Sequence, residues 1–440
     1  MDSAILSNVP TSLADLLSNT LVLRQTAPYL PAVSLCALAK TSRALHVAIR
    51  QSPDTFRYLD LSPLKAAICP VDEPLDSGGI NWRHERMDEA LTEDDFYSGP
   101  LRGILSKLEQ QHILRNVHTL LLDGLSVTAE FVKELLTEER YNVRLLSIRE
   151  VKHLNERKLQ QYLRYVVRPS RPAGTPRVKG IYLFGPREST QQPSSSTTKQ
   201  SASHAAKGYV SSQGAQIGAD WNQKSSDALT AALSRTEDKW YQPSGRMMTK
   251  KPSAEWAEIL QACDGLIAFD AVLCRGPRHN ASRTHVSGDL HNGWSFSAPY
   301  LRPSIATVAL GPAGCEACQS CPEGSAVFRS SPRNQFPLLS PVPLHGSSVA
   351  AAQMPHTVGG SKFPSLFVRC EDCLKGRWCE RCHRWWDEKC YAQSNIAQHT
   401  ELQQTELIQA IEMGGGYHII SNRKTKVRMG LCVEHCLDGR

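Results

Sequence analysis

Residues 117–125 read VHTLLLDGL, an apolar stretch with the alternation typical of a short β-strand. A helix is expected directly after it, with Thr128 as the N-cap and apolar residues on one face at 131, 132, 135 and 136. The strand pattern returns as VRLLSIR at 143–149 and as VKGIYLF at 178–184, with a second helical pattern between them. The sequence therefore predicts repeated strand–helix units along residues 100–186, a pattern that any α/β domain with alternating strands and helices would also show.

These units resemble irregular leucine-rich repeats, which stack strand–helix units into a curved solenoid. The asparagine or cysteine that this family carries after the strand is missing, and the strand starts at 117, 143 and 178 are unevenly spaced. Apolar stretches at 266–273 and 305–312 are expected as further repeat strands, so that residues 256–312 continue the repeats. The resemblance implies a concave surface that binds a protein target.

Residues 11–61 form a separate pattern, with leucines at helical spacing and prolines at 28 and 31 that break the chain between helices. The stretches YLPAVSL at 29–35, LAKTSRAL at 38–45 and PDTFRYLDLS at 53–62 together resemble an F-box. The usual leucine-proline-x-glutamate opening is replaced by VPTSL at 9–13. A plain amphipathic helical hairpin, with all its leucines in the core, is the alternative.

The F-box resemblance implies a three-helix unit that docks a substrate receptor onto the adaptor and cullin scaffold of a ubiquitin ligase. The residues expected to contact the adaptor are Leu30, Pro31, Leu35 and Leu38.

Ten of the fourteen cysteines lie in residues 313–440, most of them at metal-binding spacing. CxxC turns let two thiolates converge on one ion, and dense cysteine without a secretory signal favours zinc over disulfides. We expect about two zinc ions in this module. The candidate ligands are Cys315, Cys318, Cys321, Cys370, Cys373, Cys379, Cys382, Cys390, Cys432 and Cys436.

Two pairings are open for these ligands. The two central CxxC turns could close one tight knuckle, or they could interleave, one with the upstream cysteines at 315–321 and the other with Cys432 and Cys436, as in cross-braced treble-clef and RING-type modules. Cys390, His383 and His435 are candidate substitute ligands, with Cys390 favoured and His383 expected at the surface or behind a ligand.

The aromatic residues at 378, 385, 386 and 391 are expected to fill a thin core. The remaining cysteines are expected to be plain buried thiols: Cys36, Cys69, Cys263 and Cys274.

Composition limits the class of protein. The 440-residue chain has a net charge of +7, and no apolar run approaches the roughly 20 residues of a membrane helix. Nucleic-acid binding is disfavoured because the basic run at 423–428 is short and no finger spacing places a helix in the groove. P-loop, HExxH and GxSxG motifs are missing. A cytoplasmic or nuclear location and no intrinsic enzyme activity are expected.

Together these patterns predict a multi-domain α+β protein that acts as the substrate receptor of a cullin-based ubiquitin ligase. The alternatives are a single-chain ligase with a RING-like tail and a zinc-dependent protein or nucleic-acid binder. The expected segments are a helical unit at 11–61, repeats at 100–186 and 256–312, a disordered insertion at 187–255, and a zinc module at 313–440 with a linker at 323–362.

Overall fold

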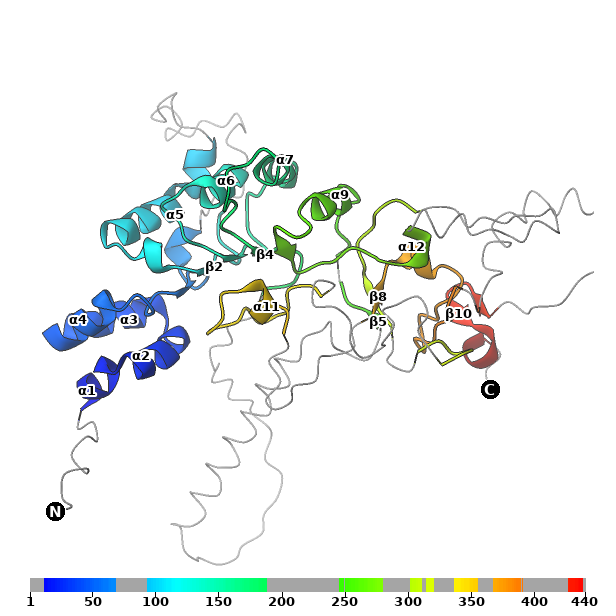
Figure 1. Cartoon of the computed structure of the whole chain (residues 1–440), viewed down its shortest axis with the longest axis horizontal. Helices are drawn as coiled ribbons and strands as arrows, with labels where there is room; N and C mark the ends of the chain where they lie inside the picture. Colours follow the sequence, from blue (N-terminus) through cyan, green and yellow to red (C-terminus); the bar gives the residue numbers. More distant parts are fainter. Residues whose placement is uncertain are drawn as a thin grey trace, which may run out of the picture.

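The structure is a computed structural model, and the account that follows concerns the part of the chain that it describes. These residues are 12–68, 93–187, 245–248, 250–279, 301–310, 314–319, 336–354, 367–388, 390 and 426–437. The fold is mixed helix and sheet, as predicted, and runs from a helical unit through a parallel sheet to a cysteine-rich end (Figure 1). Most of the predicted insertion at 187–255 lies outside the described residues, as do Cys69 and Cys321.

The helical unit begins the described chain. Polar side chains start its helices: Ser12 accepts a hydrogen bond from the backbone N–H of Asp15, and Ser42 accepts one from that of Leu45. Helices α3 and α4 pack against each other and α1 packs on α4, which buries Leu17, Leu35 and Ile49. The elements are α1 (Leu13–Ser18), α2 (Thr20–Thr26), the 3₁₀ turn η1 (Ala27–Tyr29), α3 (Ala32–Thr41) and α4 (Arg43–Gln51).

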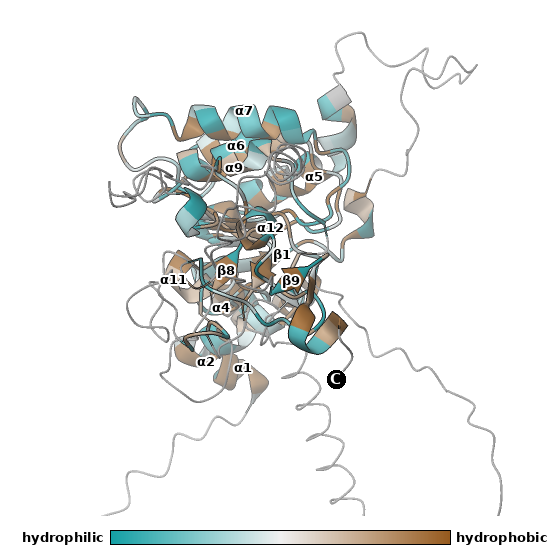
Figure 2. Cartoon of the chain, turned by 90° about the vertical axis from the view of Figure 1, so that its right-hand side faces the viewer, coloured by the Kyte–Doolittle hydropathy of each residue, from teal (hydrophilic) through white to brown (hydrophobic). Residues whose placement is uncertain are grey.

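A five-stranded parallel sheet follows, with its strands side by side in chain order. A helix lies in the chain between each strand of this sheet and the next, and these helices lie together on one face of the sheet. The hydrophilic side of α7 is turned outward (Figures 1 and 2). The strands at β2, β3 and β4 and the helices between them lie where the apolar patterns at 117–125, 143–149 and 178–184 predicted strands with helices between them. The strands are β1 (Tyr58–Asp60), β2 (Thr119–Leu121), β3 (Leu145–Ser147), β4 (Gly180–Tyr182) and β6 (Ala268–Phe269), and the helices are α5 (Glu93–Gln110), α6 (Ala129–Thr137), α7 (Glu156–Val166) and α9 (Glu255–Ala262).

The two faces of this sheet bury different side chains because alternate residues of a strand point to opposite sides. Leu120, Leu146 and Ile181 belong to the large core beneath the helices. Leu121 and Tyr182 point the other way, into a second core with Leu338 and its neighbours. Both faces are therefore covered, as is usual for a parallel sheet.

The cover on the second face is residues 336–354, which contain α11 (Val349–Ala352). The backbone N–H of Leu338 donates to the carbonyl of Phe269 (2.8 Å), and the Tyr182 hydroxyl donates to the carbonyl of Leu339 (3.1 Å). Gly180 leaves room for both neighbours on this face, since a Cβ there would lie 2.7 Å from a methyl of Leu145 and 3.1 Å from a methyl of Leu338.

The segment 336–354 corrects the predicted linker at 323–362. Its proline- and serine-rich composition disfavours regular structure but not order, and apolar residues at 336, 338, 339 and 342 anchor it to the sheet. The same segment occupies part of the sheet face opposite the helices, where it packs on Leu121, Leu145 and Tyr182.

A second, antiparallel sheet joins distant parts of the chain: β5 (Gly245–Arg246), β7 (Val308–Ala309) and β8 (Val368–Arg369). The prediction of a repeat strand at 305–312 was therefore wrong. The apolar pattern marked a buried strand correctly, but its pairing depends on partners about 60 residues away on either side, which periodicity does not reveal.

The cysteine-rich end completes the fold, with α12 (Glu371–Leu374), the hairpin β9 (Val427–Arg428) and β10 (Leu431–Cys432), and the π-helix η8 (Val433–Leu437). Short 3₁₀ turns η2 (Lys65–Ala67), η4 (Leu114–Asn116) and η6 (Pro277–His279) connect other elements. Among the described helices, none has the length and apolar character needed to cross a membrane.

Candidate metal centres

Three groups of thiol and imidazole side chains converge in the cysteine-rich end, and within each group the ligand atoms lie within 4.8 Å of one another. We call them the first, second and third clusters. The first contains Cys274, His279, Cys370 and Cys373; the second contains Cys379, Cys382, Cys432 and Cys436; the third contains Cys315, Cys318 and Cys390. Each could hold a metal ion.

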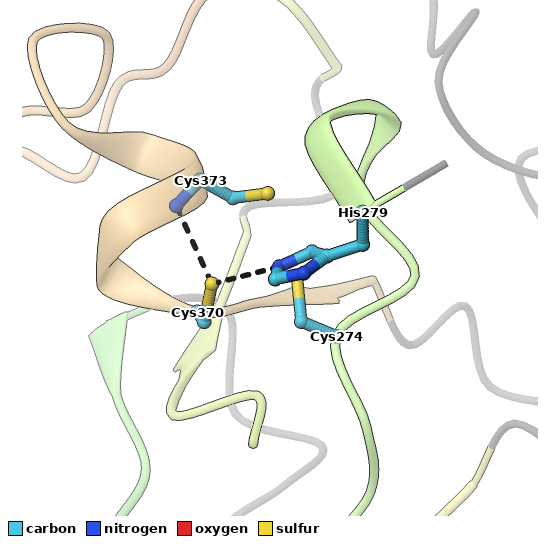
Figure 3. Close-up of side chains that lie close together, drawn as sticks. All are labelled: Cys274, His279, Cys370 and Cys373. Atoms are coloured by element: carbon cyan, nitrogen blue, oxygen red, sulfur yellow. Dashed lines mark hydrogen bonds between the residues drawn. The ribbon is translucent and has the colours of Figure 1, made fainter. Parts of the chain in front are cut away.

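The first cluster joins two segments about 90 residues apart (Figure 3). Cys274 follows the last strand of the parallel sheet, and the turn η6 brings His279 back beside it. Cys370 directly follows β8 and caps α12, so that its sulfur accepts a hydrogen bond from the backbone N–H of Cys373 (3.3 Å). The three thiols and one imidazole match the donor set of a closed tetrahedral site.

His279 is already oriented for metal binding. Its Nδ1 lies 3.2 Å from the carbonyl oxygen of Leu301, an arrangement in which Nδ1–H donates to that carbonyl and Nε2 is left as the ligand atom. The Nε2 atom points into the cluster, 3.3 Å from the sulfur of Cys370. A backbone carbonyl behind a histidine ligand is a common second partner at metal sites.

In the first cluster, the surroundings favour the thiolate form of Cys274 and the protonated form of His279. Burial raises the pKa of the Cys274 thiol, but hydrogen bonds with Cys370, Cys373 and His279 outweigh it and hold the pKa well below its ordinary value. Burial lowers the pKa of His279, yet hydrogen bonds with Cys274 and Cys370 raise it to about 10. The imidazole thus holds a proton against neighbouring thiolate, and a divalent cation at the same place would replace that proton.

The backbone around the first cluster leaves no spare room. A Cβ on Gly276 would lie 2.3 Å from the sulfur of Cys373, so this position in the Cys274–His279 loop requires glycine.

The buried guanidinium groups of Arg278 and Arg377 lie close by and both pair with Glu388 at 3.0 Å. Arg377 also donates to the carbonyl of Cys373 (2.7 Å), which ties this network to a ligand residue.

The second cluster joins a CxxC turn to the C-terminal hairpin. Cys379 and Cys382 lie in the turn between the bridged residues Trp378 and Trp385, while Cys432 ends β10 and Cys436 lies in η8. The backbone N–H of Cys432 donates to the sulfur of Cys379 (3.2 Å). Burial raises the pKa of the Cys379 thiol, but N–H donors of Cys382, Cys432 and Arg381 lower it to about 6. These N–H groups favour the thiolate that binds metal.

The third cluster offers three sulfur ligands within the described residues. The sulfur of Cys315 accepts a hydrogen bond from the backbone N–H of Asp387 (3.1 Å), and the backbone N–H of Glu316 donates to the carbonyl of Trp385 (2.9 Å). These contacts dock residues 314–319 beside the segment that carries Cys390. Cys321, the further ligand predicted here, lies outside the described residues.

The ligands of the three clusters interleave along the chain. The pair at 315 and 318 falls between the two halves of the first cluster, and Cys390 falls between the two halves of the second. A small aromatic core fills the space among them, including Trp378, Trp385 and Trp386, as predicted. Tyr391 lies outside the described residues.

Nine of the ten predicted cysteine ligands are brought into these clusters. The second cluster has one of the interleaved pairings that the spacing left open, whereas the pair at 370 and 373 joins Cys274 and His279 instead of the cysteines at 315–321. Cys274 was expected to be a plain thiol, and His279 was not among the predicted ligands. The spacing Cys-x4-His at 274–279 was the signal that could have found them.

His383 and His435, the two histidines named as substitute ligands, lie outside the three clusters. The ring of His383 stacks on Trp378, with centroids 6.1 Å apart, and lies beside Gly245. Neither His383 nor His435 belongs to a cluster among the described residues. Three clusters also exceed the two ions expected from the sequence.

The predicted adaptor contacts are divided between core and surface. Leu35 is only 2% exposed and belongs to the main core, so it is unavailable to a partner; the helical period marked it as apolar but not as buried. Leu30 and Leu38 are partly buried against the same core, and Pro31 is exposed. Other apolar side chains of the helical unit lie at the surface: Leu13, Leu16, Leu21, Tyr29, Val33 and Val47.

No family model, curated protein or solved structure matches this chain.

Proposed function

We propose that this chain is the receptor subunit of a cullin-based ubiquitin ligase and that its helical unit docks onto the ligase adaptor. The observation that carries the proposal is the apolar surface of that unit, where Leu21 is 70% exposed, Tyr29 66% and Val33 63%. Exposed apolar groups gathered on one small unit are typical of protein interaction sites. The resemblance of residues 29–62 to an F-box supplies the kind of partner.

The adaptor-binding residues in this proposal differ from those expected from sequence. Leu21 and Val33 take the place of Leu35, whose side chain holds the helices together. Pro31 stays in the set because it is exposed at the N-cap position before α3.

We further propose that the three clusters bind zinc and that the metal is structural. Thiolate and imidazole ligands suit zinc, and the first two clusters each supply the four ligands of a closed tetrahedral site, with no position left for a substrate. The chain then acts by proximity: a receptor that holds a target near a charged ubiquitin-conjugating enzyme raises the effective concentration of the target's lysines.

Co-purification of the full chain with the F-box adaptor and cullin tests the docking proposal. We expect a stoichiometric complex that the double variant Leu21→Asp/Val33→Asp abolishes, because two buried charges at an apolar interface are not compensated. The matched control is Met429→Asp, since Met429 is 94% exposed on the β9–β10 turn, far along the chain from the helical unit. Failure of the unaltered chain to bind the adaptor, or equal loss in both variants, would overturn the proposal.

Metal analysis of the same purified sample tests the second part. We expect two to three zinc ions per chain, two from the four-ligand clusters and a third where the three-ligand cluster is completed. A chain without zinc, or with another metal in its place, would contradict it.

A second candidate function is a single-chain ubiquitin ligase, favoured by the interleaved order of the ligands, which is also the arrangement in cross-braced RING-type modules. The full chain would then support ubiquitin-chain formation with an activating and a conjugating enzyme in the absence of cullin. Loss of that activity in Cys382→Ser, with adaptor binding retained, would favour this function over the receptor.

A further inference from the structure

A row of basic residues lies at the amino ends of the parallel strands. Arg57, His118, Arg144 and Lys179 each stand directly before a strand, one position upstream of the register that pairs β1 with β2, β3 and β4. We call these four residues the basic row. Backbone hydrogen bonds hold them in step: His118 N–H donates to the carbonyl of Arg57 (2.9 Å), Arg144 N–H to that of His118 (2.7 Å) and Lys179 N–H to that of Arg144 (2.7 Å).

Strands in a sheet are about 4.8 Å apart, so the basic row spans roughly 15 Å along one edge. Residues at equal register on parallel strands point to the same side of a sheet, which places the four side chains beside one another. The pKa of His118 agrees with this placement: burial lowers it, and the positive charges of Arg57 and Arg144 lower it further, with Asp54 opposing them.

The positive charge of the row is only partly neutralised. Asp54 pairs with Arg57 at 3.6 Å, and Arg57 also donates to the Ser347 hydroxyl (3.1 Å). Within the described residues, the side chains of Arg144 and Lys179 have neither an ion pair nor a hydrogen bond.

Two polar atoms of the row are buried without a hydrogen-bond partner in the described structure: Nε of Arg57 and Nδ1 of His118. The amide of Asn142 lies 3.1 Å from the other ring nitrogen of His118, an arrangement in which the amide donates to it and Nδ1 carries the proton. Both orphaned atoms are therefore N–H donors beneath the surface of the row, so the described structure leaves donors of the row, as well as part of its positive charge, without partners.

Like charges on neighbouring strands destabilise a sheet, so a row of this kind is costly unless an anion offsets it. We propose that the basic row is a binding site for an acidic peptide segment of a partner protein. An extended peptide covers this length with about five residues, and its alternate side chains would present two or three carboxylates to the row.

The size of the row favours a peptide over a nucleic acid. Nucleic-acid interfaces commonly engage some six to ten phosphates, whereas this row has four cationic or cation-capable side chains and the Asp54 carboxylate closes one end. The proposal does not depend on docking to the ligase adaptor: Arg57 lies in the F-box-like stretch, but the residues proposed for docking, Leu21 and Val33, are not part of the row.

Fluorescence anisotropy of the zinc-loaded full chain tests the proposal, with a fluorescein-labelled peptide of ten glutamates as the probe, at 50 mM salt. We expect saturable binding that the double variant Arg144→Gln/Lys179→Gln weakens about fivefold to tenfold, because two of the cations are lost. The matched control, Lys107→Gln/Arg157→Gln, removes one lysine and one arginine that are exposed but lie in helices α5 and α7; in the row, Arg144 is exposed and Lys179 is half-buried. It should change the affinity less than twofold.

Three outcomes would overturn the proposal. In the first, the unaltered chain does not bind the probe; in the second, the two double variants weaken binding equally; in the third, a ten-nucleotide thymidine strand binds more tightly than the peptide and depends on the same two residues. The second outcome would mean that net charge alone attracts the probe, and the third would mean that the row recognises phosphate backbone. Circular dichroism of both variants should match the unaltered chain, since their changed side chains make no contact that holds the fold.

Discussion

In the parallel sheet, apolar side chains are buried on both faces, whereas the cysteine-rich region has only small cores around its three clusters. The sheet core runs without a break from the helical unit to Ile305. The cores at the other end are far smaller, and several of their members are the cysteines of the clusters themselves. Small cores rarely suffice for stable folding, so the comparison teaches that the second region depends on metal for the stability that the first obtains from apolar burial.

Metal removal should produce the largest difference in stability between the two regions. With a strong zinc chelator, we expect amide protons of residues 367–388 and 426–437 to lose most of their protection from exchange, while those of β2, β3 and β4 keep theirs. Structural zinc sites contribute about 10–16 kcal/mol in isolated peptides, more than the small cores supply. Hydrogen–deuterium exchange with mass spectrometry measures both regions in one experiment.

Restoring zinc after chelation is the control, and it should return the lost protection. If β2 to β4 lose protection together with the clusters, the two regions do not differ in the way inferred. If neither region changes, the cores of the second region are sufficient without metal.

Two buried cysteines, one in each region, test the same difference by single substitutions. Cys274 belongs to the first cluster, whereas Cys263 lies in the sheet core, where burial raises its thiol pKa to about 12 and keeps it neutral. Cys274→Ser should lower the metal content by about one ion per chain, because a hydroxyl is a poor replacement for a thiolate ligand. Cys263→Ser should leave the metal content unchanged and cost about 1–3 kcal/mol, the penalty for a hydroxyl in an apolar site.

Elemental analysis and thermal unfolding of the two variants give both quantities. Equal metal content in Cys274→Ser and the unaltered chain would remove Cys274 from the ligand set, and would return it to the role of a plain thiol.

The contrast between the two regions also explains what the sequence could reveal. Residues 117–125 and their repeats predicted β2, β3 and β4 because local apolar periodicity is enough to define a strand and the helix after it. The CxxC turns were visible for the same reason, since two ligands three residues apart lie in one turn. Cys274 and His279 were missed because they contact Cys370 only in three dimensions, across about 90 residues of chain.

Long-range pairing also accounts for the other errors. The cover at 336–354 and the antiparallel strand β7 depend on partners far away in the chain, and composition alone suggested a linker and a repeat strand. Leu35 and Val33 are equally apolar members of α3, and only packing shows that one is in the core and the other at the surface.

A core substitution in the sheet tests whether the two regions unfold independently. Leu146 is fully buried in β3 beneath the helices, so Leu146→Ala should cost about 2–5 kcal/mol through lost burial and the cavity left behind. Leu21→Ala is the matched control; its side chain is 70% exposed and the change should cost less than about 0.5 kcal/mol.

Urea unfolding is followed by tryptophan fluorescence and by zinc release to a coloured indicator. The regions share the antiparallel sheet of β5, β7 and β8, which is short, with two residues in each strand. Such a small connection should transmit little stability. The part of the fluorescence change that comes from the sheet core, which contains Trp256, should shift, while the part from Trp378, Trp385 and Trp386 and the midpoint of zinc release stay in place. If zinc release shifts by the same amount, the sheet and the clusters form one cooperative unit, and the metal stabilises the whole chain instead of its C-terminal part.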